Sequence, residues 1–118
     1  MQKNKIILSH CPNFYKINDF SFYEDDYISA KLIEIYREFI FSVDINNSDE
    51  INKLEKIDYV LNKYIEDYRF RKQMQKDVLS IRVKAGNNFI KNTVDAIINS
   101  YENYEYGYTR NIYFARWI

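Results

Sequence analysis

The chain of 118 residues has little of the material from which tight turns, disulfides and metal sites are built. It contains 2 glycines, 1 proline, 1 cysteine and 1 histidine. The shortage of glycine and proline argues against a β-sandwich or a barrel, whose many short strands need frequent tight turns. The single cysteine, Cys11, excludes an intramolecular disulfide and indicates a reducing compartment. We therefore expect a cytoplasmic protein with few, long secondary-structure elements.

Long hydrophobic runs are also missing. The first ten residues include only three consecutive apolar residues, 6–8, which is too short for a signal-peptide core or a membrane span. We therefore expect no membrane association. Hydrophobic residues make up 47% of the chain and charged residues 29%, the balance of a folded chain rather than a disordered one. By its length, the sequence predicts one globular domain over residues 1–118.

Charge of one sign is not in excess, because the formal net charge is zero. The two halves nevertheless differ: residues 1–60 carry 11 acidic and 7 basic side chains, and residues 61–118 carry 6 acidic and 10 basic side chains. Such an asymmetry favours charge-guided association with a partner. Isoleucine, asparagine and tyrosine are abundant, and a genome rich in A and T explains part of that abundance. The tyrosine content is therefore only partly evidence for binding.

What the sequence does have is apolar residues at helical spacing. Separations of three and four recur in four segments, which are residues 25–43, 47–68, 69–83 and 88–105. Asn47 followed three residues later by Glu50 has the pattern of a capping box. A turn is expected at residues 85–88, and residues 1–24 have no sustained period and are expected to be a packed irregular segment. The predicted fold class is mainly α, a compact bundle of about four helices.

The two ends of the chain define the main variant of this fold. Alternating tyrosines at 104–108 are typical of a strand, although tyrosines there also fit the spacing of a helix. Gly107 suits the residue just past a helix. We therefore expect the last helix to end near residue 105 and residues 108–118 to be extended. In the variant, this segment and residues 6–9 form a short antiparallel strand pair.

Neither a catalytic site nor a metal site is predicted. His10 and Cys11 are adjacent, and adjacent residues rarely direct their side chains at each other as a nucleophile and its base must. A second histidine and a Cys-x-x-Cys pair, which would suit zinc, do not occur. The acidic residues near position 25 lack the glycine-assisted loop of a calcium site and suit the start of a helix instead. We expect no catalytic residues, no metal, no cofactor and no enzymatic activity.

A basic stretch is the first candidate binding surface. Its cations could contact the phosphates of a nucleic acid, and they could equally meet an acidic protein or the acidic half of the chain itself. The isoelectric point of about 6.6 is lower than dedicated nucleic-acid-binding domains usually have. Nucleic-acid binding is therefore the alternative function, through Arg69, Arg71, Lys72, Lys76, Arg82 and Lys84.

Acidic and aromatic residues form the second candidate surface. Tyrosine and tryptophan combine a large apolar body with a polar group and are favoured at protein interfaces. The residues expected to bind a partner are Asp19, Glu24, Asp25, Asp26, Tyr106, Tyr108, Arg110, Tyr113, Arg116 and Trp117. The preferred hypothesis is a small non-catalytic inhibitor or antidote that occludes another protein. Examples are an immunity protein against a bacterial toxin and a phage-encoded inhibitor of a host nuclease or defence protein. A homodimer is left open.

Overall fold

Apolar residues at helical spacing produce an all-helical chain. The computed structural model describes residues 2–19, 27–81 and 89–117, and it describes side chains within residues 6–19, 27–77 and 89–105. Within these ranges there are six helices and no strand. In chain order they are α1 (Gln2–Ser9), α2 (Phe14–Asn18), α3 (Tyr27–Ser42), α4 (Ser48–Glu66), α5 (Tyr68–Ile81) and α6 (Phe89–Trp117). The mainly α prediction is confirmed.

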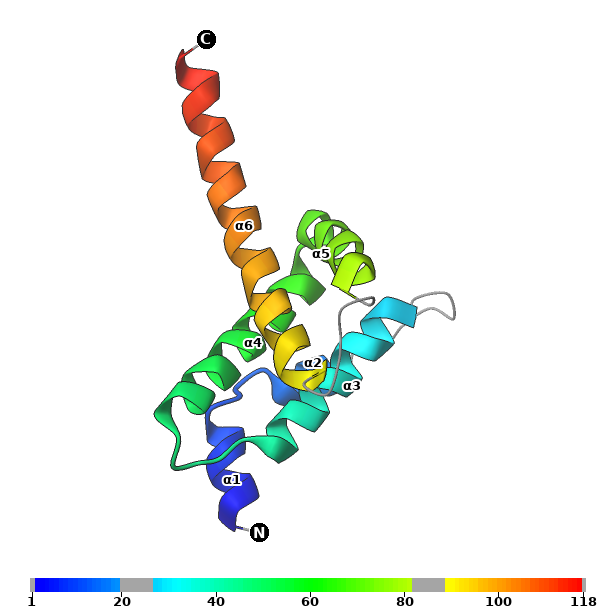
Figure 1. Ribbon diagram of the computed structural model, residues 1–118, viewed down its shortest axis with the longest axis vertical. Coiled ribbons are helices and arrows are strands. Elements are labelled where there is room, and N and C mark those ends of the chain that lie inside the picture. The colour runs from blue at the N-terminus through cyan, green and yellow to red at the C-terminus, as the bar shows by residue number, and fades with distance from the viewer. Residues whose placement is uncertain (1, 20–26, 82–88, 118) are drawn as a thin grey trace.

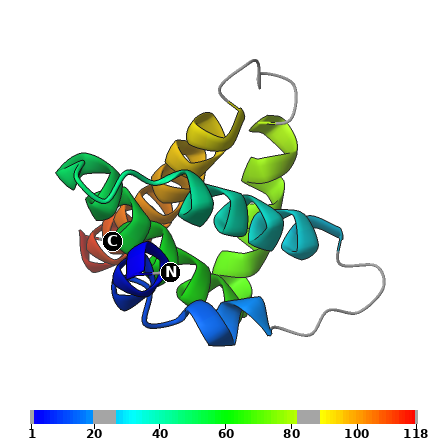
Figure 2. The same ribbon diagram turned by 90° about the horizontal axis from the view of Figure 1, so that it is seen from below.

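Helix α6 is the long element against which the others are arranged. It contacts α3, α4 and α5, and α2 packs on α4. Seen from below in Figure 2, α3 runs across the group formed by α4, α5 and α6. The C-terminal part of α6 extends beyond the rest of the molecule, and α1 lies at the opposite end (Figure 1). The molecule is therefore elongated, with extents of 56 × 33 × 29 Å.

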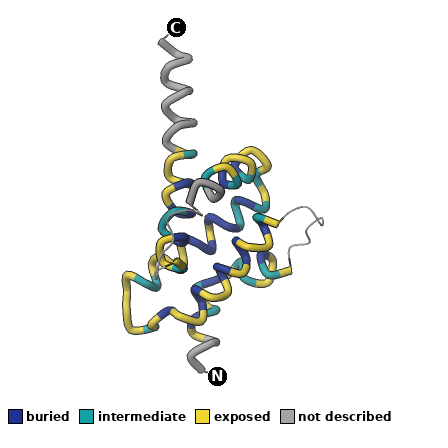
Figure 3. The backbone as a smooth tube through the Cα atoms, turned by 45° about the vertical axis from the view of Figure 1, so that its right-hand side comes forward, coloured by how far each residue is buried: buried dark blue, intermediate teal, exposed yellow. Residues whose placement is uncertain are grey.

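One apolar cluster lies where the helices meet, and buried residues accordingly line their inner faces in Figure 3. It draws on α1 to α6 and on the connection before α4. Its largest fully buried side chains are Tyr36, Phe70, Ile7, Ile17, Leu32, Leu54, Ile57, Leu61, Met74, Ile97, Val43 and Val94. The predicted helices 25–43, 47–68, 69–83 and 88–105 correspond to α3, α4, α5 and the first part of α6. Helical periodicity therefore located most of the core.

The N-terminal segment is more regular than predicted. It forms α1 and α2, which are short and contribute Ile7, Cys11 and Ile17 to the core. The ring of Phe14 lies 6.1 Å from that of Tyr36 in α3. Helices of eight and five residues are too short to show a periodic pattern and are marginal in isolation. The packing of α2 on α4 and the burial of Ile7 in the core stabilise them.

A buried carboxylate fixes the N-terminal segment to the helices beneath it. Asp58 in α4 is 2% exposed. Its Oδ1 accepts a hydrogen bond from the hydroxyl of Tyr36 at 2.6 Å. Its Oδ2 accepts from the backbone N and the side-chain Nδ2 of Asn13, at 3.3 and 3.0 Å. A buried charge must be compensated by such donors, so Asp58 ties three segments of the chain together.

Polar caps determine where α4 begins and ends. Asn47 accepts hydrogen bonds from the backbone N of Asp49 and Glu50, as predicted. The second half of the predicted capping box, in which Glu50 would accept from the backbone N of Asn47, is wrong. The Glu50 carboxylate accepts instead from the backbone N of Asp44 at 2.8 Å. Asp67 then separates α4 from α5 and caps α5 by accepting from the backbone N of residues 69 and 70.

Replacing Asn47 with alanine is expected to lower the free energy of unfolding by about 1 kcal/mol, because the first turn of α4 loses its cap. Urea denaturation followed by circular dichroism measures this change. Asn46→Ala is the matched control, since Asn46 is exposed and precedes the cap. Equal unfolding midpoints for the two variants would contradict the capping role.

The predicted strand pair is wrong. Residues 6–9 lie in α1, and residues 108–117 belong to α6, whose helix does not end near residue 105. Gly107 is inside this helix, and no glycine in the described ranges has a positive φ. A glycine inside a helix lowers the stability of that helix by only about 1 kcal/mol relative to alanine. Gly107 therefore does not force the helix to end. The expected turn at residues 85–88 falls outside the described residues.

Candidate functional site

The acidic and aromatic candidate residues are only partly described. Asp19 is exposed and follows the last residue of α2, whereas Glu24, Asp25 and Asp26 lie outside the described residues. The aromatic and basic candidates between residues 106 and 117 belong to the part of α6 that projects in Figure 1. Their side chains lie outside the described part of the structure. Assignment of these residues to a binding surface stays a prediction.

Three cations of the basic stretch share one exposed face. Arg69, Lys72 and Lys76 in α5 are exposed, and Phe70 and Met74 of the same helix are fully buried, as helical spacing predicts. These cations could meet an anionic surface. Arg82 and Lys84 lie outside the described residues.

Arg71 is placed differently from its neighbours. Its Nε donates a hydrogen bond to the carbonyl O of Tyr64 at 3.1 Å, and its Nη2 donates to that of Ile65 at 2.5 Å. These carbonyls belong to the last turn of α4, where orphan acceptors and the helix dipole favour a cation. Arg71 therefore closes the end of α4. Its removal would test the stability of the fold rather than a phosphate contact.

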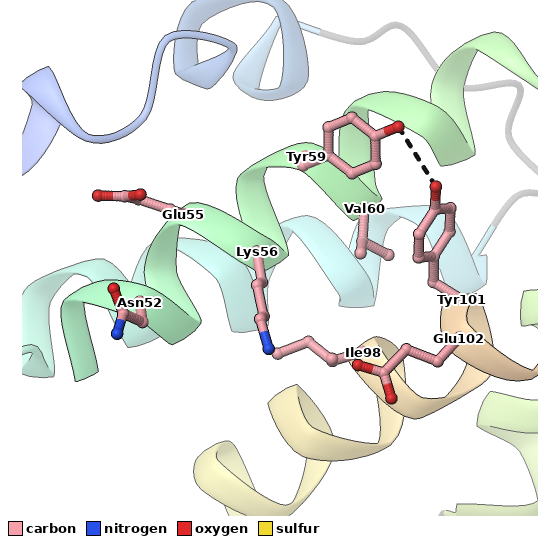
Figure 4. A pocket seen from close by; sticks show the side chains of 8 residues that line it. All are labelled: Asn52, Glu55, Lys56, Tyr59, Val60, Ile98, Tyr101 and Glu102. Atoms are coloured by element: carbon pink, nitrogen blue, oxygen red, sulfur yellow. Dashed lines mark hydrogen bonds between the residues drawn. The ribbon is translucent and has the colours of Figure 1, made fainter. Parts of the chain in front are cut away.

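A groove of about 440 Å³ lies between α4 and α6. Val60 of α4 and Ile98 of α6 belong to its lining but are buried, at 2% and 8% exposed. Polar and aromatic side chains stand around them, as Figure 4 shows. The full lining is Asn52, Glu55, Lys56, Tyr59, Val60, Ile98, Tyr101 and Glu102. Its volume falls within the range of about 300–1,000 Å³ that is usual for ligand sites.

Two tyrosines form one end of this groove. The rings of Tyr59 and Tyr101 meet edge to face, with centroids 5.5 Å apart and planes at 81°. The hydroxyl of Tyr101 donates to that of Tyr59 at 3.3 Å, and this contact is drawn in Figure 4. Tyr101 also packs edge to face on Phe70, at 5.4 Å. Tyr59 remains 54% exposed, so a positioned ring faces the solvent.

Burial and charge act together on Tyr101. Burial removes water from its hydroxyl and raises the pKa, and the bond to Tyr59 and the negative charge of Glu105 raise the pKa further. Tyr101 is therefore neutral at physiological pH and acts as a hydrogen-bonding and stacking group, not as a tyrosinate.

The groove lining carries two carboxylates, Glu55 and Glu102, and one ammonium group, Lys56. Oε1 of Glu55 is 2.7 Å from Nδ1 of His10 and is partly neutralised when that histidine is protonated. Among the described residues, no basic side chain lies within 4.0 Å of the Glu102 carboxylate. The lining is therefore mildly acidic.

Sequence reasoning did not find this groove. Tyr59 falls outside the apolar stripe of the predicted helix 47–68, and an aromatic residue on the polar face of an amphipathic helix was the available signal. The other half of the site could not be read from the local sequence, because it depends on how α6 crosses α4.

His10 and Cys11, which are adjacent in the sequence, lie in separate environments and do not form a catalytic pair. His10 pairs with Glu55, whereas Cys11 is buried near Tyr36 and Asp58. Burial raises the pKa of the Cys11 thiol from 9.0 to about 11, the opposite of what an activated nucleophile needs. The described residues contain no group of three or more histidine, cysteine or acidic side chains placed to hold a metal ion.

Labelling of Cys11 by a thiol-specific disulfide reagent at pH 8 is expected to be at least about 100-fold slower in the native protein than in urea. A pKa raised by two units lowers the thiolate fraction by that factor, and burial limits access further. Because the folded-state pKa is raised, this thiol should also make the protein less stable as the pH rises from 9 to 11. Equal labelling rates with and without urea would contradict this placement of Cys11.

The chain matches no protein-family model, and no curated protein sequence or solved structure was found to resemble it significantly. Within the described ranges, none of the helices has both the length and the apolar character needed to cross a bilayer.

Proposed function

We propose that this protein is a small non-catalytic inhibitor or antidote, which binds a target protein and occludes its working surface. The supporting observation is the groove between α4 and α6. It combines apolar surface, a partly exposed tyrosine held by a second tyrosine, and a charged rim. This arrangement is characteristic of interface centres, where a few aromatic residues dominate the binding energy and a polar rim surrounds them.

The geometry suits occlusion because the site is preorganised. Tyr101 is fixed between Phe70 and Tyr59, so little side-chain entropy is lost when a partner covers the pair. The target classes remain those that the sequence favours: a bacterial toxin, a nuclease or a host defence protein. The unequal charge of the two halves would accelerate encounter, and the tyrosine contacts would slow release.

Affinity capture from a lysate of the native host tests this proposal. The wild-type chain is expected to retain one protein in stoichiometric amount, and the purified target should lose its activity on 1:1 addition of the chain. Failure to recover such a target, or a target that keeps full activity when bound, would overturn the inhibitor function.

Tyr59→Ala should reduce capture of the target at least about tenfold, since truncating a central interface tyrosine commonly costs 2 kcal/mol or more. The matched control is Tyr15→Ala in α2, whose side chain is 70% exposed and absent from the groove. Quantitative mass spectrometry of the retained protein measures both variants. Equal losses in the two variants, or none in either, would remove the groove from the proposal.

A further inference from the structure

We propose that the groove between α4 and α6 receives an arginine side chain of the partner protein. Its guanidinium group would lie between the tyrosine pair and the carboxylate of Glu102. This inference rests on the proposed protein-binding function and specifies which residue of the partner the groove recognises.

Charge complementarity points to a cationic occupant. The groove has two carboxylates against one ammonium group, and Glu105 lies one helical turn beyond Glu102 on the exposed side of α6. Glu55 already has His10 as a partner, so Glu102 is the carboxylate available to an incoming cation. An anionic occupant such as a phosphate would meet repulsion from the same groups.

The tyrosines of this chain provide an internal comparison. A lysine ammonium lies 5.6 Å from the ring centroid of Tyr27 and another lies 5.3 Å from that of Tyr68, and the Arg71 guanidinium lies 5.7 Å from that of Tyr64. These are cation–π distances. Tyr59, which is 54% exposed, and Tyr15, which is 70% exposed, have no such cation among the described side chains. Exposed tyrosines of this chain therefore occur with and without a neighbouring cation, and the ring of Tyr59 is open to one from a partner.

Arginine fits this place better than lysine. Its planar guanidinium group stacks on an aromatic face and can bond a carboxylate with two parallel N–H groups, whereas an ammonium group is a point charge that keeps its water. The rings of Tyr59 and Tyr101, with the small exposed part of Ile98, would contact the aliphatic stem of the side chain. The groove therefore provides one contact for each chemical part of arginine.

A titration with two matched peptides tests the inference. The probes are acetyl-Leu-Arg-Leu-amide and the same peptide with citrulline, which preserves the shape of arginine and removes its charge. Amide spectra of the ¹⁵N-labelled full chain report binding. The arginine peptide is expected to shift the signals of Tyr59, Tyr101 and Glu102 in a saturable manner. The citrulline peptide should bind about tenfold more weakly, because the cation–π and ion-pair contributions are both lost.

Glu102→Gln should weaken the arginine peptide several-fold and leave the citrulline peptide unaffected. Glu38→Gln, at an exposed position in α3, is the control and should change neither affinity. Both variants are checked for an unchanged fold in the same spectra. Equal affinity for the two peptides, unaltered binding by Glu102→Gln, or shifts confined to α5 would each overturn the inference.

This experiment separates the inference from the function on which it rests. A target protein that depends on Tyr59, together with equal binding of the two peptides, would retain the inhibitor function and reject arginine recognition. Arginine-selective binding without a target would retain the recognition chemistry and reject the inhibitor function.

Discussion

Replacing Asp58 with alanine is expected to lower the free energy of unfolding by about 2–4 kcal/mol, because several hydrogen bonds to a buried carboxylate are lost together. The Tyr36 hydroxyl would lose its acceptor in a buried place, and two part-buried N–H groups of Asn13 would lose theirs. Each unsatisfied buried donor costs about 1–3 kcal/mol. Because this carboxylate joins α3, α4 and the segment before α2, its loss should also loosen the N-terminal helices.

Asp95→Ala is the control for this effect. Asp95 in α6 forms an ion pair with Lys53 at 2.9 Å, and both side chains are 46% exposed. Exposed pairs of this kind contribute about 0–1 kcal/mol. Urea denaturation of both variants gives the comparison, and Tyr36→Phe supplies a milder change if Asp58→Ala does not fold. Unfolding midpoints that fall equally for Asp58→Ala and Asp95→Ala would contradict the role assigned to Asp58.

Replacing Phe70 with alanine should also cost about 3–5 kcal/mol, the usual range for removing a fully buried aromatic side chain. Phe70 is 0% exposed, and its ring contacts those of Tyr101 and Tyr104 in α6, at 5.4 and 5.2 Å. The cavity would lie directly behind the wall of the groove. We therefore expect Phe70→Ala to weaken target binding as well as the fold, with Tyr101 losing its support.

Phe41→Ala is the control that shows whether the cost of Phe70→Ala comes from burial or from the loss of any aromatic ring. Phe41 is near the end of α3 and is 72% exposed, so its replacement should change the free energy of unfolding by no more than about 0.5 kcal/mol. Thermal unfolding by calorimetry resolves this difference. If Phe70→Ala is no more destabilising than Phe41→Ala, then α5 and α6 are not packed as described.

Helical periodicity was sufficient to predict the elements that form most of the core. The stripes in α3, α4 and α5 are regular, and Asn47 marks the start of α4 by a local side-chain contact. The sequence did not predict two of the helices, because the contacts that stabilise them are not local. α1 and α2 are too short for a period, and they depend on contacts such as that of Asn13 with Asp58, which lies 45 residues away.

The candidate site was less predictable than the fold. The density of aromatic residues at 106–117 predicted a binding surface there, yet density in a sequence does not say which rings meet. Tyr59 and Tyr101 are 42 residues apart, and only the packing of α6 against α4 makes them neighbours. Arg71 shows the same limit, because it has the composition of a phosphate contact and the position of a helix cap.

Hydroxyl-radical footprinting of the isolated complex with the proposed target tests most directly whether the groove between α4 and α6 is the docking surface. Tyr59 is the probe inside the groove, and Tyr15, which is more exposed and lies on α2, is the reference outside it. We predict that binding strongly suppresses the oxidation of Tyr59 and leaves that of Tyr15 unchanged. Undiminished oxidation of Tyr59 in a complex of full occupancy would contradict the account.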